Sequence, residues 1–206
     1  MANTPQIAST DPFSPEAHDP MPCFRAWLRE AEASEPNDPT AMALATATPT
    51  GLPSVRMVLL KEVRDAEFVF YTNAQSRKGD ELYANPHAAL CLHWKSLRRQ
   101  VRIEGPVIEV SAERADTYFR SRSRESQLSA AASEQSRPLV DRATLEARTA
   151  ELAQRYPDEV PRPSHWTGFA VHAERLEFWR GGAHRLHDRM LYTRVGDTWE
   201  RTRLYP

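Results

Sequence analysis

Residues 41–73 read AMALATATPTGLPSVRMVLLKEVRDAEFVFYTN, and this stretch decides the fold. It holds three runs of apolar and β-branched residues, separated by the short segments PTGLP and RDAE. Such runs joined by tight turns predict three consecutive antiparallel strands. A parallel dinucleotide-binding sheet is not expected, because its strands need long crossover connections and the chain contains no G-x-G-x-x-G motif.

The same pattern continues along the chain. Further strands are predicted by AALCLHWK, RRQVRIEGPVIEV, WTGFAVHAERLEFWRGG, HRLHDRMLYTR and DTWERTRLYP. Helices are predicted over residues 20–34 and 76–85, and in three pieces between residues 111 and 156. Many hairpin-linked strands interrupted by helices predict a mainly β, α+β fold, in which an antiparallel barrel carries helices on its outside.

The first 19 residues are predicted to be a flexible N-terminal arm, because they are rich in proline and poor in apolar residues. Residues 20–206 are predicted to be a single domain. The N-terminus lacks the basic and apolar regions of a signal peptide, and no apolar run is long enough for a membrane helix. Cys23 and Cys91 are expected to be reduced. A cytoplasmic protein is therefore expected.

The net charge of −1, from 27 basic and 28 acidic residues, makes a nucleic-acid or membrane-surface partner unexpected. Anion binding would then depend on a few cations gathered in one place. Two histidine pairs, His184 with His187 and His87 with His93, have no carboxylate or thiolate at ligand spacing. No metal site is therefore predicted.

Two short basic segments are candidate anion sites. Arg56 and Lys61 flank an otherwise apolar strand, where a cation is unusual unless it meets an anion. Equally, both could lie at strand ends and extend into water. Their separation of five places them on opposite faces of an ideal strand, so one shared ligand would require a bulge. Arg77 and Lys78 lie at the start of a predicted helix, where N–H groups favour phosphate, although a solvated basic turn is the alternative.

Two further groups are spaced for one face of an element. Tyr118, Arg122 and Ser126 share a helix face if the helix continues through SRSRES, and they could hold a phosphate. An ordinary polar helix face is the alternative. Arg185, His187 and Arg189 alternate along a predicted strand and would face the same way. An exposed edge strand is the alternative for that group.

The chain resembles the pyridoxine (pyridoxamine) 5'-phosphate oxidases. The matching stretches, in family order, are RMVLLK (56–61), YTN (71–73), SRK (76–78), RQVRIEG (99–105), YFRSRSRESQ (118–127), EQS (134–136), EFWRGGAHRLHDR (177–189) and RLYP (203–206). The resemblance implies an FMN-binding split barrel that forms a homodimer, with each FMN held between subunits. It implies oxidation of pyridoxamine or pyridoxine 5'-phosphate to pyridoxal 5'-phosphate, with dioxygen as the electron acceptor and hydrogen peroxide as a product.

The resemblance also implies roles for individual residues. The implied cofactor-binding residues are Arg56, Met57, Val58, Leu59, Leu60, Lys61, Tyr71, Thr72, Arg77, Lys78, Gln100, Gln135, Ser136, Trp179 and Arg189. The implied substrate-binding residues are Lys61, Tyr118, Arg122, Ser126, Arg185 and His187, of which Arg185 and His187 are the catalytic candidates.

The chain departs from the family pattern at a few positions. Ser123 replaces a frequent proline and is expected to loosen a turn beside the substrate phosphate. Thr167-Gly168 stands for a glycine pair, and Arg180 stands for a glutamine beside Trp179. A phenazine-type oxidase of the same fold is one rival, against which Lys61 and Arg99-Gln100-Val101 argue. A non-catalytic carrier of FMN or pyridoxal phosphate is the other.

Overall fold

The computed structural model describes residues 9–206, whose strands form one antiparallel sheet that curls into a split barrel. The first half supplies α1 (Pro20–Ser34), β1 (Ala41–Ala47), β2 (Pro53–Leu59), β3 (Glu62–Arg64), β4 (Glu67–Asn73), α2 (Arg77–Ala84), β5 (His87–Trp94) and β6 (Arg99–Glu109). The second half supplies α3 (Ala112–Ser121), α4 (Arg124–Ala132), α5 (Arg142–Arg155), β7 (Trp166–His172), β8 (Arg175–Arg180), β9 (Asp188–Val195) and β10 (Thr198–Leu204). The predicted mainly β fold with flanking helices is confirmed.

The barrel splits at β6, the longest strand. Its first half pairs with β8 and its end pairs with β7, while β5 lies along its other edge. Gly105 lies between the two pairings, where a Cβ atom would come within 1.9 Å of the His172 carbonyl oxygen. Only glycine permits this close approach. One branch of the sheet therefore runs β10-β9-β8-β6-β5-β1-β2, and the other runs through β7 and β4 to β3.

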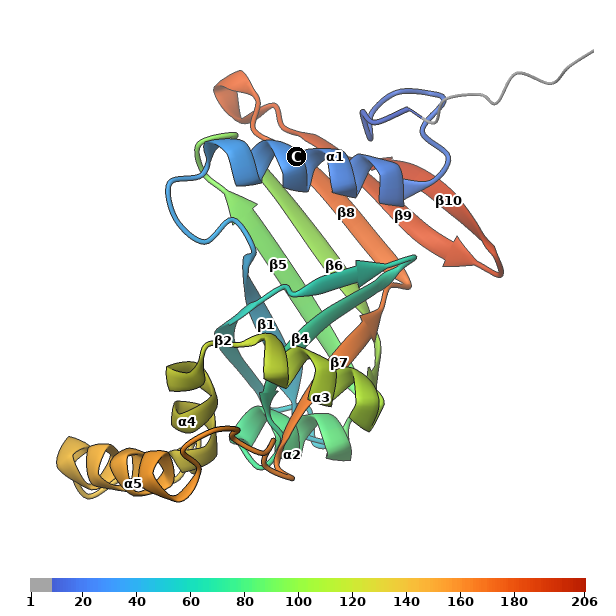
Figure 1. Cartoon of the computed structure of the whole chain (residues 1–206). Helices are drawn as coiled ribbons and strands as arrows, with labels where there is room; N and C mark the ends of the chain where they lie inside the picture. Colours follow the sequence, from blue (N-terminus) through green and yellow to red (C-terminus); the bar gives the residue numbers. More distant parts are fainter. Residues whose placement is uncertain (1–8) are drawn as a thin grey trace, which may run out of the picture.

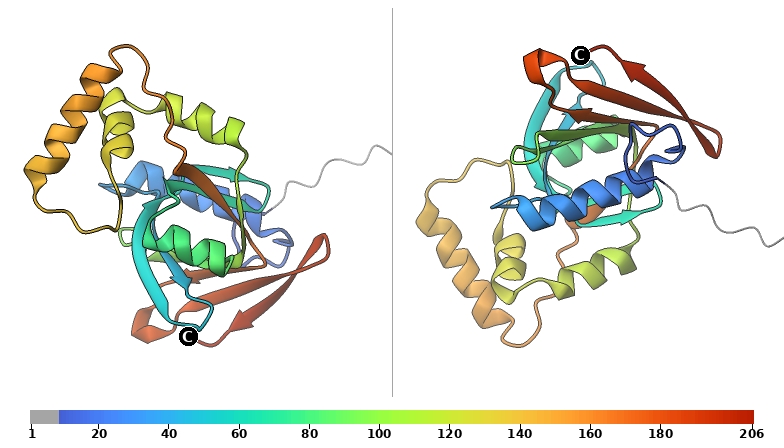
Figure 2. Two further views of the ribbon diagram at one scale, coloured as in Figure 1. Left: turned by 90° about the horizontal axis from the view of Figure 1, so that it is seen from below. Right: turned by 90° about the horizontal axis from the view of Figure 1, so that it is seen from above.

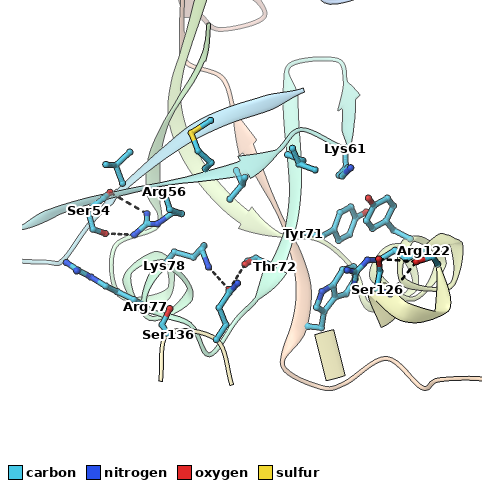
Figure 3. A pocket seen from close by; sticks show the side chains of 18 residues that line it. Ser54, Arg56, Lys61, Tyr71, Thr72, Arg77, Lys78, Arg122, Ser126 and Ser136 are labelled. Atoms are coloured by element: carbon cyan, nitrogen blue, oxygen red, sulfur yellow. Dashed lines mark hydrogen bonds between the residues drawn. The ribbon is translucent and has the colours of Figure 1, made fainter. Parts of the chain in front are cut away.

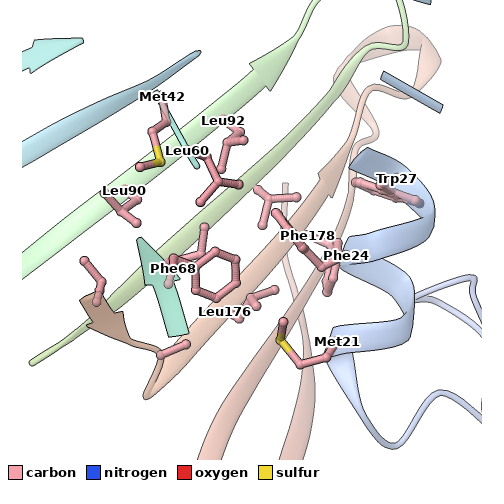
Figure 4. Packing of buried hydrophobic residues seen from close by; sticks show 14 of the residues in the cluster. Met21, Phe24, Trp27, Met42, Leu60, Phe68, Leu90, Leu92, Leu176 and Phe178 are labelled. Atoms are coloured by element: carbon pink, nitrogen blue, oxygen red, sulfur yellow. The ribbon is translucent and has the colours of Figure 1, made fainter. Parts of the chain in front are cut away.

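The core lies between α1 and the sheet (Figure 4). Asp19 caps α1 by accepting a hydrogen bond from the Met21 N–H. The ring of Phe24 meets Phe68 edge-on at 4.9 Å between centroids, and Trp27 meets Phe178 in the same way at 5.1 Å. Helix α1 therefore closes one end of the barrel against both branches of the sheet.

The prediction of a flexible arm over residues 1–19 is wrong for residues 9–19. Phe13 is buried, and the Tyr192 hydroxyl donates to the carbonyl oxygens of Pro12 and Ala17 at 2.8 and 2.9 Å. Arg201 donates to the Pro15 carbonyl at 2.9 Å. Composition could not reveal these contacts, because they are made with the opposite end of the chain. Residues 1–8 lie outside the described part of the structure.

Helices α3, α4 and α5 gather at one end of the molecule, and the β9–β10 hairpin lies at the other (Figures 1 and 2). Between residues 9 and 206, no helix is long and apolar enough to cross a membrane.

Candidate cofactor and substrate site

A cavity of about 910 Å³ lies between β2, β4, α2 and the α3–α4 junction. It brings together most of the predicted site residues: Arg56, Met57, Val58, Leu59, Lys61, Tyr71, Thr72, Arg77, Lys78, Tyr118, Arg122, Ser126, Gln135 and Ser136. Ser54, Val55, Ser123 and Trp166 also line it. Leu60 does not line the cavity, because it points into the core. Figure 3 shows the polar side chains as two groups on either side of the cavity.

Lys78 is the buried cation of the first group. Its side chain is only 7% exposed, and Nζ donates to Ser76 Oγ at 2.9 Å and to Gln135 Oε1 at 2.6 Å. No carboxylate of residues 9–206 lies within ion-pair distance of it. Burial, and then the charge of Arg56, lower the pKa of Lys78 to about 8. A buried ammonium without a counter-ion suits an anionic ligand.

The opposite-face difficulty for Arg56 and Lys61 is resolved by the end of β2. The strand stops at Leu59, so side-chain alternation does not extend to Lys61. Arg56 donates to Thr46 Oγ1 and Ser54 Oγ, both at 2.5 Å, and its Nη2 lies 3.4 Å from Glu81. Arg77 Nε donates to the same carboxylate at 2.9 Å. Sequence reasoning missed Glu81, although its spacing of four from Arg77 on a helix was a usable signal.

Stacked aromatic rings form a wall beside the second group of polar side chains, which contains Lys61, Arg122 and Ser126. Tyr71 stacks on Tyr118 at 4.1 Å and on Trp166 at 5.3 Å between centroids. The Tyr71 hydroxyl donates to Glu62 at 2.5 Å, and Arg114 Nε donates to the same carboxylate at 3.1 Å. Burial, together with the hydrogen bond to Glu62, raises the pKa of Tyr71 well above its ordinary value. Tyr71 is therefore a neutral donor fixed in place.

Arg122 lies beside this wall and has no anionic partner among residues 9–206. Its guanidinium carbon is 5.0 Å from the centre of the Trp166 ring, and its Nη1 is buried with no hydrogen-bond acceptor among the described residues. Burial lowers its pKa. A buried guanidinium nitrogen with no acceptor in this part of the chain indicates that an anion completes the site.

The condition that one helix continues through residues 118–126 is not met. Helix α3 ends at Ser121, and Arg122 has extended backbone dihedral angles. Ser123 does not loosen the turn, because its hydroxyl caps α4 by accepting the Ser126 N–H. The cap competes with continuation of the helix. Tyr118, Arg122 and Ser126 still reach the same cavity, because two short helices meet at its edge.

Besides Leu60, five predicted site residues lie away from this cavity. Gln100, Trp179 and Arg189 are register partners on β6, β8 and β9, so they form one row across the sheet. Buried Glu177 holds Arg189 through two contacts of 2.8 and 3.1 Å. The His187 ring lies 4.8 Å from the Trp179 ring. Arg185 is exposed in the loop beside this row.

The prediction that Arg185 and His187 alternate with Arg189 along a strand is wrong. Residues 183–185 form a 3-10 turn, and β9 begins only at Asp188. His184 and Arg185 both have positive φ angles, of 52° and 63°. The loop is tight, since a Cβ atom on Gly182 would come within 1.7 Å of the Leu186 carbonyl oxygen. His187 Nδ1 accepts the Gly182 N–H at 3.1 Å, which fixes the histidine ring.

Arg180, the departure from the family pattern, is tied into the same region. Its Nη2 lies 2.9 Å from Asp188, and its guanidinium covers the Phe13 ring at 4.4 Å. Between residues 9 and 206, no cluster of three or more His, Cys, Asp and Glu side chains could hold a metal ion.

Known proteins resemble this chain along nearly its whole length. The family model described as pyridoxamine 5'-phosphate oxidase matches residues 28–156, and the one described as pyridoxine 5'-phosphate oxidase C-terminal dimerisation region matches residues 166–206. A pyridoxine/pyridoxamine 5'-phosphate oxidase of Gluconobacter oxydans is 61% identical, over 91% of this chain and 94% of the relative. Its counterpart in Rhodospirillum rubrum is 60% identical, over 93% and 98%.

Solved structures agree with these sequence matches. PhzG from Burkholderia lata, in complex with tetrahydrophenazine-1-carboxylic acid, is 34% identical with a TM-score of 0.87, covering 92% of this chain and 93% of that one. A pyridoxamine 5'-phosphate oxidase-related, FMN binding protein from Nostoc punctiforme is 18% identical with a TM-score of 0.75, covering 91% and 98%, and shows the fold alone. The family model that spans residues 28–156 and the relatives about 60% identical establish that this chain belongs to the pyridoxamine 5'-phosphate oxidase family.

Proposed function

We propose that this protein oxidises pyridoxamine 5'-phosphate and pyridoxine 5'-phosphate to pyridoxal 5'-phosphate, with FMN as cofactor and dioxygen as electron acceptor. Family membership at about 60% identity supports the reaction. The observation that carries the proposal is one cavity with two cations, Lys78 and Arg122, that lack carboxylate partners among residues 9–206. Two such cations suit two phosphates, one on the cofactor and one on the substrate.

The FMN phosphate is assigned to the end of the cavity that contains Arg56, Arg77 and Lys78. Gln135 supports this end, because its Oε1 accepts hydrogen bonds from both Lys78 and Thr72. Ser136, at φ 72°, is held in a backbone conformation that non-glycine residues rarely adopt. The donor set therefore fits a terminal phosphate, and the chain has no glycine-rich dinucleotide turn.

The substrate phosphate is assigned to Lys61, Tyr118, Arg122 and Ser126 at the other end. Lys61 is exposed to the cavity, and Arg122 presents its nitrogens beside the aromatic wall. This grip is remote from the reacting carbon, so its binding energy serves to orient the pyridine ring. A ring held in this way reacts as though the step were intramolecular.

The protein forms a homodimer, and we propose that the second copy completes the site. The family's dimerisation region covers residues 166–206, which include Trp179, Arg185, His187 and Arg189. These side chains do not reach the cavity of their own chain. Val55 and Met57 on β2 leave exposed apolar surface at the rim of the cavity. We therefore assign the Gln100–Trp179–Arg189 row of one copy to the flavin held by the other.

FMN, when bound, supplies the acceptor for the hydride from the C4' carbon, and dioxygen then takes the electrons to form hydrogen peroxide. Arg185 is assigned to stabilise charge at the reacting edge of the substrate. His187 is assigned to position Arg185. The Gly182–His187 hydrogen bond and the Trp179 ring hold His187 in a defined orientation. The stacked rings of Tyr71, Tyr118 and Trp166 form an apolar wall beside the substrate end of the cavity.

We also propose that residues 20–206 act as one domain and that the protein works in the cytoplasm. A single connected sheet supports the first point. Free cysteines at positions 23 and 91 support the second.

The decisive experiment measures hydrogen peroxide after pyridoxamine 5'-phosphate is added to the purified flavoprotein. Stoichiometric peroxide and pyridoxal 5'-phosphate are expected, and chromatography of the flavin released by denaturation should identify FMN. A protein that binds both molecules without producing peroxide would be a carrier. Release of FAD as the main flavin would contradict the cofactor assignment.

A further inference from the structure

Glu81 is a buried carboxylate directly behind the cofactor-phosphate end of the cavity. Its side chain is 5% exposed, and it projects from α2 toward β1 and β2. It accepts hydrogen bonds from Ser54 Oγ at 2.5 Å and from the Thr46 hydroxyl. Its other contacts are Arg77 Nε at 2.9 Å and Arg56 Nη2 at 3.4 Å. Three elements of the barrel therefore meet at one acidic group.

This carboxylate is ionised at every pH at which the enzyme could work. Burial opposes its ionisation, but hydrogen bonds from Ser54, Thr46 and Arg77 outweigh burial and lower the pKa of Glu81 to about 2. An ionised carboxylate in this position is stable only while its donors remain directed at it. Glu81 therefore favours conformations in which these donors point toward it.

Arg77 and Arg56 depend on Glu81 to different degrees. Arg56 also donates to Thr46, Ser54 and a main-chain carbonyl, so it has several anchors. Arg77 is 57% exposed, and Glu81 is its one hydrogen-bond acceptor within residues 9–206. Without Glu81 the long Arg77 side chain would sample many rotamers, and fixing it on a ligand would cost conformational entropy.

We infer that Glu81 is a positioning residue for the cofactor phosphate, which orients Arg77 and Arg56 and sets the net charge of their subsite. Three cations, Arg56, Arg77 and Lys78, and one carboxylate leave this end of the cavity with two net positive charges. A phosphate monoester carries about −1.5 to −2 near pH 7, so the charges match. The inference rests on the proposed function, because it takes the anion to be the phosphate of FMN.

The test compares FMN with riboflavin, which has the same ring system and no phosphate. Flavin-free protein is titrated with each ligand, and quenching of flavin fluorescence reports binding. In Glu81→Gln the affinity for FMN should fall about tenfold or more, since one charge-assisted hydrogen bond loses its alignment. The affinity for riboflavin should not change. The ratio of the two affinities is the readout that a general loss of structure would not alter.

Asp80 provides the matched control. It neighbours Glu81 on α2, is exposed, and pairs with Arg137 at 3.5 Å outside the cavity. Asp80→Asn removes the same charge from the same helix and should leave the FMN-to-riboflavin ratio unchanged. If Glu81→Gln does not fold, Glu81→Asp keeps the charge but withdraws it from Arg77, and should also lower the ratio.

Three results would overturn the inference. Tighter FMN binding by Glu81→Gln would mean that Glu81 only opposes the phosphate. An equal loss of FMN and riboflavin affinity would assign Glu81 to folding alone. Unchanged FMN binding by Glu81→Asp would mean that its position does not matter. Failure of the proposed function would look different, because the wild-type protein itself would then bind riboflavin as tightly as FMN.

Discussion

Replacement of Arg122 by methionine tests the substrate end of the cavity most directly. Arg122 is proposed to bind the substrate phosphate, and charge-assisted hydrogen bonds of this kind contribute about 1.5–3 kcal/mol. Their loss should raise the KM for pyridoxamine 5'-phosphate roughly ten- to a hundredfold. Turnover should also fall, because a poorly held ring spends less time in the reactive geometry.

The stability of the flavin-free protein should hardly change in the same variant. Arg122 loses a cation–π contact with Trp166, which contributes about 0.5–2 kcal/mol. Its removal also relieves a buried nitrogen without an acceptor, whose desolvation costs about 1–3 kcal/mol. Because these contributions have similar size and opposite sign, the free energy of unfolding should stay within about 1 kcal/mol of the wild-type value.

Initial rates of peroxide formation over a range of substrate concentrations provide KM, and fluorescence titration provides the affinity for FMN. Arg120→Met is the matched control, because Arg120 is exposed on the last turn of α3, two residues before Arg122. It should leave both constants near the wild-type values. If Arg122→Met instead weakens FMN and keeps a normal KM, the α3–α4 junction belongs to the cofactor and the assignment of the two ends is wrong.

Three other predictions concern the cofactor, the dimer and the aromatic wall. The affinity for FMN should be highest below about pH 8 and should decline above it. The pKa of Lys78 in the flavin-free protein is lowered to about 8, and only its protonated form attracts the phosphate. Lys78→Met should abolish this dependence in titrations from pH 6 to 10. Dissociation of the dimer should release flavin, which light scattering and flavin fluorescence can follow together on dilution; a monomer that retains one FMN per chain would refute the shared site. Gly168→Ala should lower the free energy of unfolding by about 1–3 kcal/mol, since its Cβ would lie 2.6 Å from the Tyr71 ring. Denaturant unfolding measures this change, and an unchanged unfolding midpoint would show that the ring can move freely.

The strands could be predicted from sequence because each depends on local patterns. The first and third runs became β1 and β4 within one residue of their expected bounds, whereas β2 ends at Leu59, four residues before the end of the second run. The short β3 occupies the end of the second run, after the chain bends at Leu60. This bend brings Lys61 to the same cavity as Arg56, which strict alternation did not allow.

The errors arose where a short segment had two locally acceptable conformations. Residues 118–126 carry helical spacing, but the capping hydroxyl of Ser123 stabilises a break that divides the helix. Residues 183–187 carry strand alternation, but the glycine pair before them permits a tight turn instead. The first outcome depends on a side-chain cap and the second on a tight glycine turn, and hydropathy patterns report neither.

Local patterns could have paired Glu81 with Arg77, but not with its strand partners, and they could not reveal the docked N-terminal segment, because these contacts are distant in sequence. Glu81 meets Thr46 and Ser54, 35 and 27 positions away. The separation of the predicted site into a cavity and a remote row is also a property of the assembled sheet. The sequence does not show that Lys78 lines the cavity while Arg189 lies outside it.

The docking of the N-terminal segment on the last hairpin constrains how the chain folds as it leaves the ribosome. Tyr192 follows its acceptor Pro12 by 180 residues. At roughly 5–20 residues per second, the segment waits about 10–35 s before that hydroxyl has been synthesised. Trp27 likewise waits for Phe178. The apolar face of α1 therefore stays incompletely covered until translation is nearly finished, and nascent chains that stall before β8 are the species most exposed to aggregation.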